Sequence, residues 1–86
     1  MSYRIELFRE AEKTLATLDR VIERRIREKL RELAQAPLDP RLSKQMETAK
    51  DRRYARVGDW RIIYRVNEAA KTLDIMAIRP RSRAYR

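Results

Sequence analysis

The sequence contains no cysteine and no histidine. Their absence excludes disulfides, thiolate nucleophiles, imidazole bases and the common zinc sites. Carboxylates are the remaining metal ligands, and those of the basic C-terminal region, Asp59, Glu68 and Asp74, lack the clustering that Mg²⁺ binding requires. We therefore expect chemistry that needs no metal and no cofactor.

Long apolar runs are also missing. No run approaches the roughly 18 residues of a membrane span, and the first residues, Met-Ser-Tyr-Arg-Ile-Glu, lack the apolar core of a signal peptide. The sequence therefore predicts a cytoplasmic protein with no membrane partner. Its 86 residues suffice for one domain, residues 1–86, with one core that buries about 60 to 65% of the unfolded chain's surface.

Acidic residues are scarce in the C-terminal part of the chain, although the whole sequence carries a net charge of +9. Residues 1–51 hold 12 basic and 10 acidic side chains, whereas residues 52–86 hold 10 basic and only 3 acidic ones. Such a basic region predicts nucleic acid or an acidic protein as the partner.

The apolar pattern of the first half predicts one strand and two helices. Alternation indicates a strand over Tyr3–Leu7, and helical spacing then continues to about Leu18. Asp19 is a good N-cap for a second helix, which Pro37 ends. The opposite face of this helix mixes Arg and Lys with Glu, and such a face is either simply solvated or contacts RNA or a partner. Its apolar stripe consists of Ile22, Ile26, Leu30, Leu33 and Ala34.

The second half predicts a sheet. Residues 37–51 contain two prolines and no clean period, so we expect a long connection, which in compact domains is often functional. Strands then flank a two-residue turn at 58–59, and a third strand over 72–78 follows the turn at 68–71. The predicted fold is α+β: an N-terminal strand, a two-helix hairpin and an antiparallel three-strand meander that forms one twisted sheet.

The hairpin register places Arg56 opposite Arg61. Like charges directly opposite one another on a sheet repel, so this pair opposes folding unless an anion lies between the two side chains. On the same strand, alternation predicts a helix-packed set, Trp60, Ile62, Tyr64 and Val66, and an outward set, Arg61, Ile63 and Arg65. The paired arginines are the first indication of a phosphate site.

A second basic cluster, Arg79, Arg81, Arg83 and Arg86, surrounds Tyr85 at the end of the sequence. Arginine cannot act as a base, because its pKa stays above about 12. A phenol has a pKa near about 10, which surrounding positive charge lowers. Arginines that hold a phosphate and a tyrosine that moves a proton would make a ribonuclease site. The alternative for Tyr85 is an aromatic side chain packed on the edge of the sheet.

The chain resembles the RelE/ParE superfamily of toxin–antitoxin toxins over its whole length. The resemblance is carried by Arg-Val-Gly-Asp-Trp-Arg-Ile-Ile-Tyr at 56–64 and by Arg-Ser-Arg-Ala-Tyr at 81–85. It implies a RelE-like microbial ribonuclease fold. One branch, the RelE-like toxins, cuts messenger RNA in the ribosomal A site, whereas the ParE-like branch poisons DNA gyrase by binding it.

The RelE-like branch implies a site on the hairpin and near the C-terminus. Its catalytic positions match Arg56, Arg61, Arg79 or Arg81, and Tyr85. Tyr54 stands where the family often has a second basic residue, and it either stacks on a base, transfers a proton or simply packs. The proton acceptor is therefore Tyr85, Tyr54 or a loop lysine. The expected RNA-binding residues are Arg53, Tyr54, Lys44, Lys50 and Arg83.

The resemblance thus implies a ribosome-dependent mRNA endonuclease in which a ribose 2′-OH attacks the adjacent phosphodiester and gives a 2′,3′-cyclic phosphate. The expected partners are the ribosome, mRNA and a cognate acidic antitoxin in a toxin–antitoxin hetero-oligomer. Two alternatives remain: a ParE-like inhibitor of gyrase, and a catalytically inactive module that binds RNA or an antitoxin.

Overall fold

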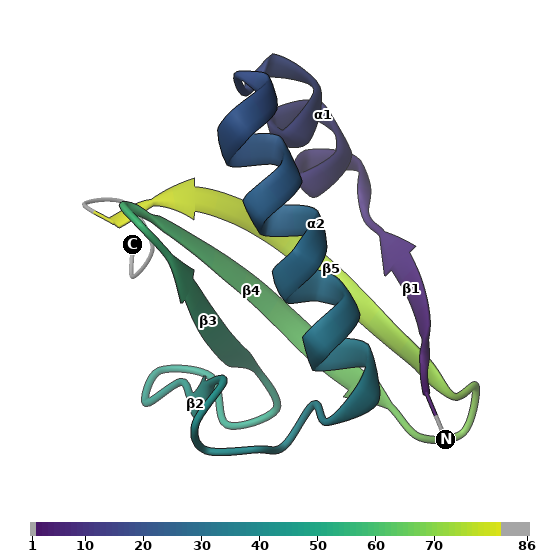
Figure 1. Cartoon of the computed structure of the whole chain (residues 1–86). Helices are drawn as coiled ribbons and strands as arrows, with labels where there is room; N and C mark the ends of the chain where they lie inside the picture. The colour runs from purple at the N-terminus through teal and green to yellow at the C-terminus, as the bar shows by residue number, and fades with distance from the viewer. Residues whose placement is uncertain (1, 82–86) are drawn as a thin grey trace.

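Two helices cover one face of a mixed β-sheet (Figure 1). The structure is a computed structural model that describes residues 2–81. Within these residues the elements are β1 (Arg4–Leu7), α1 (Arg9–Thr17), α2 (Arg20–Gln35), β2 (Lys44–Gln45), β3 (Arg53–Val57), β4 (Trp60–Asn67) and β5 (Thr72–Pro80). The strand order is β1-β5-β4-β3-β2, with β1 parallel to β5 and the other neighbours antiparallel.

The sequence begins and ends α2 as predicted. Asp19 caps the helix, because its Oδ1 accepts a hydrogen bond from the backbone N–H of Ile22 at 3.0 Å. After Gln35 the backbone leaves the helical region at Ala36, directly before Pro37. No helix within residues 2–81 is long and apolar enough to cross a membrane.

The β3–β4 hairpin has the predicted register. Gly58 adopts a φ of +57°, a left-handed conformation that glycine takes without steric cost. Arg56 consequently lies opposite Arg61, and Val57 lies opposite Trp60. The predicted meander of β3, β4 and β5 is confirmed, and the structure extends it by the parallel β1 and by β2, a short strand that the loop sequence did not reveal.

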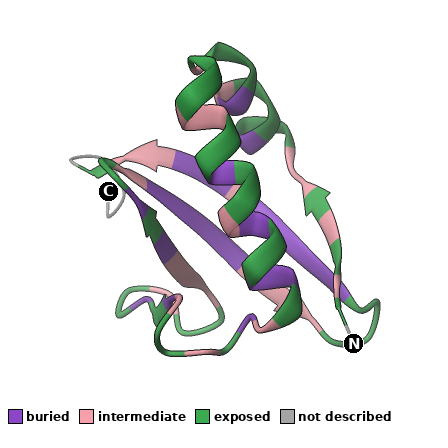
Figure 2. Ribbon diagram, viewed as in Figure 1, coloured by how far each residue is buried: buried purple, intermediate pink, exposed green. Residues whose placement is uncertain are grey.

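The main core lies between the helices and the sheet (Figure 2). The inner faces of α1 and α2 pack on β4 and β5, where Ile62 and Tyr64 are fully buried as predicted. Burial of these apolar side chains is the main favourable contribution to folding. The largest fully buried side chains are Tyr64, Ile26, Leu33, Ile62, Leu73, Ile75 and Ile78.

The opposite face of the sheet differs from the prediction. Arg61 and Ile63 do lie on the face away from the helices, but they are not exposed, since only 7% and 4% of their surfaces are accessible. Ile63 packs with Met46 and Ala77 in a second, smaller apolar cluster. Met46 follows β2, so the long connection after α2 folds back against this face. Alternation along a strand fixes the face of a side chain but not what covers it.

Candidate functional site

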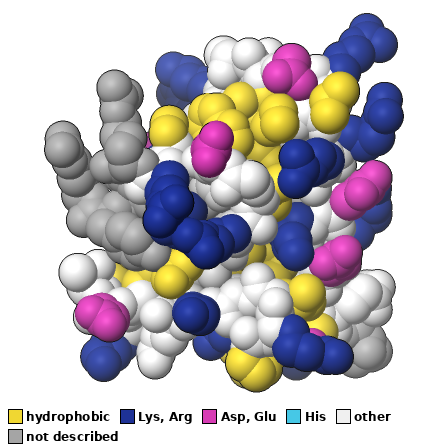
Figure 3. Space-filling model, turned by 60° about the vertical axis from the view of Figure 1, so that its left-hand side comes forward, with side chains coloured by type: hydrophobic (Ala, Val, Ile, Leu, Met, Phe, Trp, Pro, Cys, Tyr) yellow, Lys and Arg dark blue, Asp and Glu magenta, His cyan; other side chains and the backbone are white. Residues whose placement is uncertain are grey.

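A hollow of about 380 Å³ lies between α2, the loop that follows it and the strands β3 and β4; we call it the basic cleft. None of its described lining residues is acidic. The lining consists of Lys29, Pro40, Arg41, Leu42, Ser43, Lys44, Tyr54, Arg56 and Arg61. Five of these nine side chains are cations, and Figure 3 shows Lys and Arg side chains gathered in the middle of one face. Such a lining favours an anionic ligand.

Arg61 and Tyr54 meet on the sheet side of the cleft. The guanidinium carbon of Arg61 lies 5.2 Å from the centre of the Tyr54 ring, a cation–π contact. The sequence produces this contact because Tyr54 and Arg56 alternate onto one face of β3, and the hairpin register brings Arg61 to the same face. The buried guanidinium is thereby held beside the more exposed Arg56.

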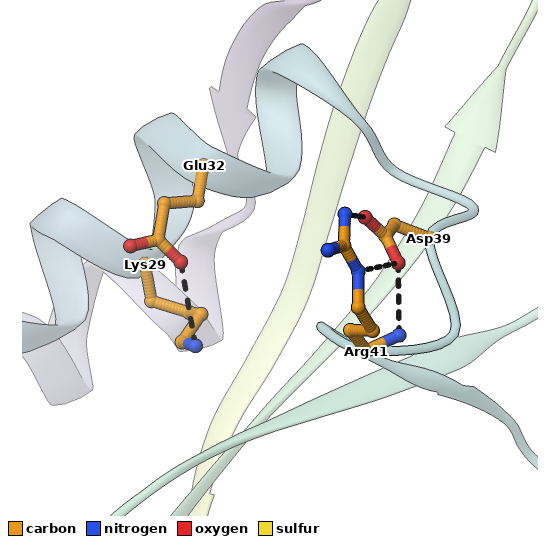
Figure 4. Close-up of polar contacts among 4 residues, drawn as sticks. All are labelled: Lys29, Glu32, Asp39 and Arg41. Carbon is orange, nitrogen blue, oxygen red and sulfur yellow. Dashed lines mark hydrogen bonds and ion pairs between the residues drawn. The ribbon is translucent and has the colours of Figure 1, made fainter.

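Two cations on the walls of the cleft have carboxylate partners (Figure 4). On α2, Lys29 Nζ lies 3.4 Å from Glu32 Oε1. On the loop, Arg41 donates to both oxygens of Asp39, at 2.8 and 3.2 Å, and its backbone N–H donates at 2.9 Å. These hydrogen bonds from Arg41 hold the pKa of Asp39 below its usual value, and the attraction between the charges adds to the effect.

Two further cations of the cleft, Lys44 on β2 and Arg56 on β3, are exposed and form no ion pair with any carboxylate of residues 2–81. Their charges are therefore available to a ligand. An anion placed between Arg56 and Arg61 would also relieve the repulsion that the hairpin register imposes on this pair.

A hydrogen-bond network fixes the loop wall; we call it the loop anchor. Arg53 donates from Nε to Ser43 Oγ at 2.8 Å and from Nη2 to the Ser43 carbonyl at 3.0 Å. Ser43 Oγ is also hydrogen-bonded to the Tyr64 hydroxyl, which donates to the Pro37 carbonyl. Because Tyr64 is fully buried in the core, the loop anchor ties the cleft wall to the sheet.

The structure brings four of the sequence-predicted residues together, because Lys44, Tyr54, Arg56 and Arg61 all line the basic cleft. Arg53 lies instead in the loop anchor. Lys50 is exposed outside the cleft, and its carbonyl accepts from Gln45 Nε2 at 2.7 Å.

The C-terminal candidates lie elsewhere. Arg79 donates from Nε and Nη2 to the carboxylate of Glu10, at 2.7 and 3.0 Å, and does not line the cleft although its backbone pairs with Arg61. Arg81 is exposed just beyond β5, with its backbone N–H donating to the Asp59 carbonyl at 2.8 Å. The predicted sites Arg83 and Tyr85 lie outside the described residues.

Three lining residues with polar or charged side chains were not selected from the sequence, namely Lys29, Arg41 and Ser43; nor were the apolar Pro40 and Leu42. Lys29 belongs to the charged face of α2, for which RNA contact was an open alternative. Arg41 and Ser43 lie in a loop without periodicity, and no sequence signal marks them. Within residues 2–81, no group of three or more acidic side chains is arranged to hold a metal ion.

Comparison with known proteins gives a family and a fold. Residues 5–85 match the family model of the ParE toxin of the type II toxin–antitoxin system, parDE. The RelE–RelB complex of Pyrococcus horikoshii OT3 contains a chain with 32% identity and a TM-score of 0.80; the match covers 98% of this chain and 100% of that one. The RelBE2 complex of Mycobacterium tuberculosis gives 26% identity, a TM-score of 0.80 and coverage of 94% and 100%.

A more distant structure supports the fold alone. The isolated RelE toxin of E. coli has 15% identity and a TM-score of 0.82, with coverage of 96% of this chain and 88% of that one. A search of curated protein sequences gave no match. The RelE-like α+β fold and the superfamily predicted from the sequence are both confirmed by these comparisons.

Proposed function

Because this chain belongs to the ParE toxin family of type II toxin–antitoxin systems, within the RelE/ParE superfamily, we propose that it inhibits translation by cutting mRNA on the ribosome. The observation that carries the proposal is the basic cleft, which combines two facing arginines, an aromatic ring and no acidic lining residue among those described. Such a surface suits a phosphodiester flanked by an unstacked base.

In the proposed reaction the 2′-oxygen of a ribose forms a bond to the adjacent phosphorus while the bond from phosphorus to the 5′-oxygen breaks. The products are a 2′,3′-cyclic phosphate and a fragment with a 5′-OH. Arg56 and Arg61 hold the phosphate oxygens, where negative charge accumulates in the transition state. A preorganised donor of this kind contributes about 3 to 4 kcal/mol to catalysis.

The proton of the 2′-OH passes to a general base. We assign this role to Tyr85, with Tyr54 and Lys44 as the candidates inside the cleft. The leaving 5′-oxygen takes its proton from solvent, with Arg81 stabilising its charge. Arg79 suits this step less, because its guanidinium is already hydrogen-bonded to the carboxylate of Glu10, which offsets its charge.

We further propose a cognate acidic antitoxin that covers the basic cleft. The similar toxins of Pyrococcus horikoshii and Mycobacterium tuberculosis were solved in complexes with antitoxins. The cleft contains five cations that an acidic segment would neutralise. Co-expression of a small acidic protein encoded by an adjacent gene should restore growth, whereas high-yield expression of the toxin alone without a growth defect would contradict this proposal.

A second candidate function is inhibition of DNA gyrase, because the matching family model is described by the ParE toxin. In that case the basic cleft would contact a protein rather than RNA. The two candidates are separated by running single-turnover mRNA cleavage on programmed ribosomes beside a gyrase supercoiling assay. If the wild-type toxin leaves the message intact and blocks supercoiling, the ribonuclease proposal is wrong.

The choice of base is tested by Tyr85→Phe, which removes only the hydroxyl. Loss of a proton-transfer group should slow cleavage by about 100-fold while ribosome binding hardly changes. Tyr54→Phe is the matched variant, because it keeps the ring that stacks against Arg61. Cleavage of RNA without ribosomes should be slow for all variants, since the ribosome aligns the 2′-OH with its phosphate. If Tyr54→Phe produces the larger loss, the base lies in the cleft.

A further inference from the structure

A second hollow, of about 220 Å³, adjoins the basic cleft at the tip of the hairpin; we call it the turn hollow. It shares Lys29 and Arg56 with the cleft, so the two hollows lie next to each other between α2 and β3; we call them together the groove. The turn hollow is lined by Arg25, Glu28, Lys29, Glu32, Arg56, Val57 and Gly58. The mechanism above assigns no role to it.

Three exposed cations along this groove form no ion pair with any carboxylate of residues 2–81: Arg25, Lys44 and Arg56. Neighbouring cations are paired instead, Lys29 with Glu32 and Arg41 with Asp39. The unpaired charges therefore come from three different elements, α2, β2 and β3, that the fold brings to one groove.

The three unpaired cations follow one another along β3 and the turn after it. Lys44 pairs with Tyr54 in the β2–β3 ladder, Arg56 comes two residues later, and Nη1 of Arg25 lies 3.9 Å from where a Cβ on Gly58 would be. Positions 54 and 56 are separated by about 7 Å along β3, and position 58 lies beyond the end of the strand, in the turn. Phosphates of a stacked nucleic-acid strand advance about 3.4 Å per nucleotide along the helix axis, and an extended strand spaces them more widely, so a step of about 7 Å suits neighbouring phosphates of an extended strand.

We infer that a single RNA strand lies along β3, with its scissile phosphate at Arg56 and Arg61 and a flanking phosphate in the turn hollow at Arg25. Lys44 takes the phosphate on the other side. The inference rests on the proposed ribonuclease function, because it extends the substrate site of that reaction. A cationic groove with an aromatic platform is the usual surface for single-stranded nucleic acid, and Tyr54 supplies that platform beside Arg56.

The turn hollow also contains two carboxylates, Glu28 and Glu32. Removing the charge of an unpaired carboxylate should strengthen RNA binding, whereas removing that of Arg25 should weaken it. Glu32 is paired with Lys29, whereas Glu28 is exposed and forms no ion pair with a described cation. A negative charge at Glu28 repels a phosphate held by Arg25, three residues earlier on α2. Glu28→Gln should therefore strengthen message binding about twofold or threefold, while Arg25→Gln weakens it.

The first experiment compares Arg25→Gln with Arg24→Gln in single-turnover cleavage on programmed ribosomes. Arg24 is the matched control, because it is an exposed arginine of α2 that lines neither hollow. Glutamine has nearly the helix propensity of arginine, so neither change disturbs α2. Arg25→Gln should raise KM fivefold to tenfold with kcat unchanged, and it should reduce the salt dependence of binding by about 0.7 in log–log slope, the value for one single-stranded phosphate.

The second experiment removes the charge from the RNA. Messages with a neutral methylphosphonate on either side of the scissile phosphate are cut by wild type and by Arg25→Gln. If Arg25 holds a flanking phosphate, one of the two substitutions should raise the wild-type KM but leave that of Arg25→Gln unchanged, because the contact is already lost. The position that behaves in this way identifies the side on which the strand enters the turn hollow.

The results distinguish failure of the phosphate subsite from failure of the ribonuclease function. If wild type cleaves the message but Arg25→Gln behaves like Arg24→Gln, or if neither methylphosphonate couples to Arg25, the phosphate subsite is wrong and the ribonuclease function stands. If Arg25→Gln weakens only the binding of the antitoxin, the turn hollow is a protein contact and the inference is also wrong. If wild type does not cleave at all, the proposed function itself fails.

Discussion

Three basic side chains near β5 have carboxylate partners, whereas three along β3 have none among the described residues. We call these regions the paired side and the unpaired side of the sheet. Beside β5, three basic side chains are paired: Arg79 with Glu10 at 2.7 Å, Arg65 with Asp74 at 3.2 Å and Lys71 with Glu68 at 3.0 Å. Along β3, by contrast, Arg25, Lys44 and Arg56 have no carboxylate partner within residues 2–81. The lack of a carboxylate partner in this part of the chain therefore distinguishes these three cations along β3 from the three paired side chains beside β5.

The largest effect on cleavage should come from substituting an arginine of the cleft on β4. An arginine of the same strand that pairs with a carboxylate serves as the comparison. Arg61→Ala removes a guanidinium from the basic cleft and should lower single-turnover kcat by 100-fold to 1000-fold. Arg65→Ala is the matched control, because Arg65 lies on the same strand but pairs with Asp74. It should destabilise the fold, since it leaves the buried Asp74 with only the hydrogen bond from Thr72, yet cleavage per folded molecule should be unchanged.

Arg61 is itself buried, so its loss also removes packing against Tyr54. Urea unfolding must accompany the kinetics, and Arg61→Lys provides a second variant that keeps the charge and part of the stem. Lysine cannot offer the planar pair of donors, so we expect an intermediate loss of about 10-fold to 100-fold. If Arg61→Ala and Arg65→Ala cleave equally well, the cleft arginine has no greater role in the reaction than the paired one.

The sequence predicts the fold well because its signals are local. Asp19 as the N-cap, the apolar stripe of α2 and the hairpin register at Gly58 all depend on neighbouring residues, and all are confirmed. The β2 strand and the burial of Ile63 were missed, because both depend on where the long loop folds in space.

The site was only partly predictable, for the same reason. Alternation and register place Tyr54, Arg56 and Arg61 on one face, so these residues could be found from the sequence. Counting charge by segment assigned the basic surface to residues 52–86, whereas Arg25 and Lys44 come from the nearly balanced first half. Which cations have partners depends on tertiary contacts such as Arg79 with Glu10, which are separated by 69 residues.

A smaller effect should follow from loosening the loop anchor, which holds the cleft wall of the unpaired side. Tyr64→Phe keeps the buried ring and removes the hydroxyl that donates to the Pro37 carbonyl. We expect the free energy of unfolding to fall by about 1 kcal/mol, near the lower limit for a lost buried donor, because Ser43 Oγ already lies 3.4 Å from the same carbonyl and can replace the bond.

The functional consequence should be a faster exchange of amide hydrogens in residues 38–45 and a modest rise in KM, since Arg41 and Lys44 lie on this wall. Tyr3→Phe is the control, because its hydroxyl bonds to Glu68 at the exposed end of β1. Loop exchange that is identical in the two variants would show that the loop anchor does not hold the wall.

The smallest effect concerns the paired side and its dependence on pH. The hydrogen bonds from Arg79 lower the pKa of Glu10 below its ordinary value of 4.5, against a smaller opposing effect of burial. Because the folded pKa is depressed, the contribution to stability is present above about pH 4.5 and is lost as pH falls through the folded value. Half of the Glu10 side chain is exposed, so solvent screening keeps this contribution small.

Glu10→Gln therefore tests whether the ion pair between Arg79 and Glu10 stabilises the fold and whether it affects cleavage. The stability difference between wild type and Glu10→Gln should shrink as pH falls from 5 toward 3 and also shrink at high salt, whereas Glu12→Gln, an exposed neighbour with no described ion pair, should show no such trend. At neutral pH, Glu10→Gln releases Arg79 without removing it. If cleavage then stays constant, Arg79 acts only in the ion pair; if cleavage accelerates, Arg79 assists the leaving oxygen when released, and the two sides of the sheet share the reaction.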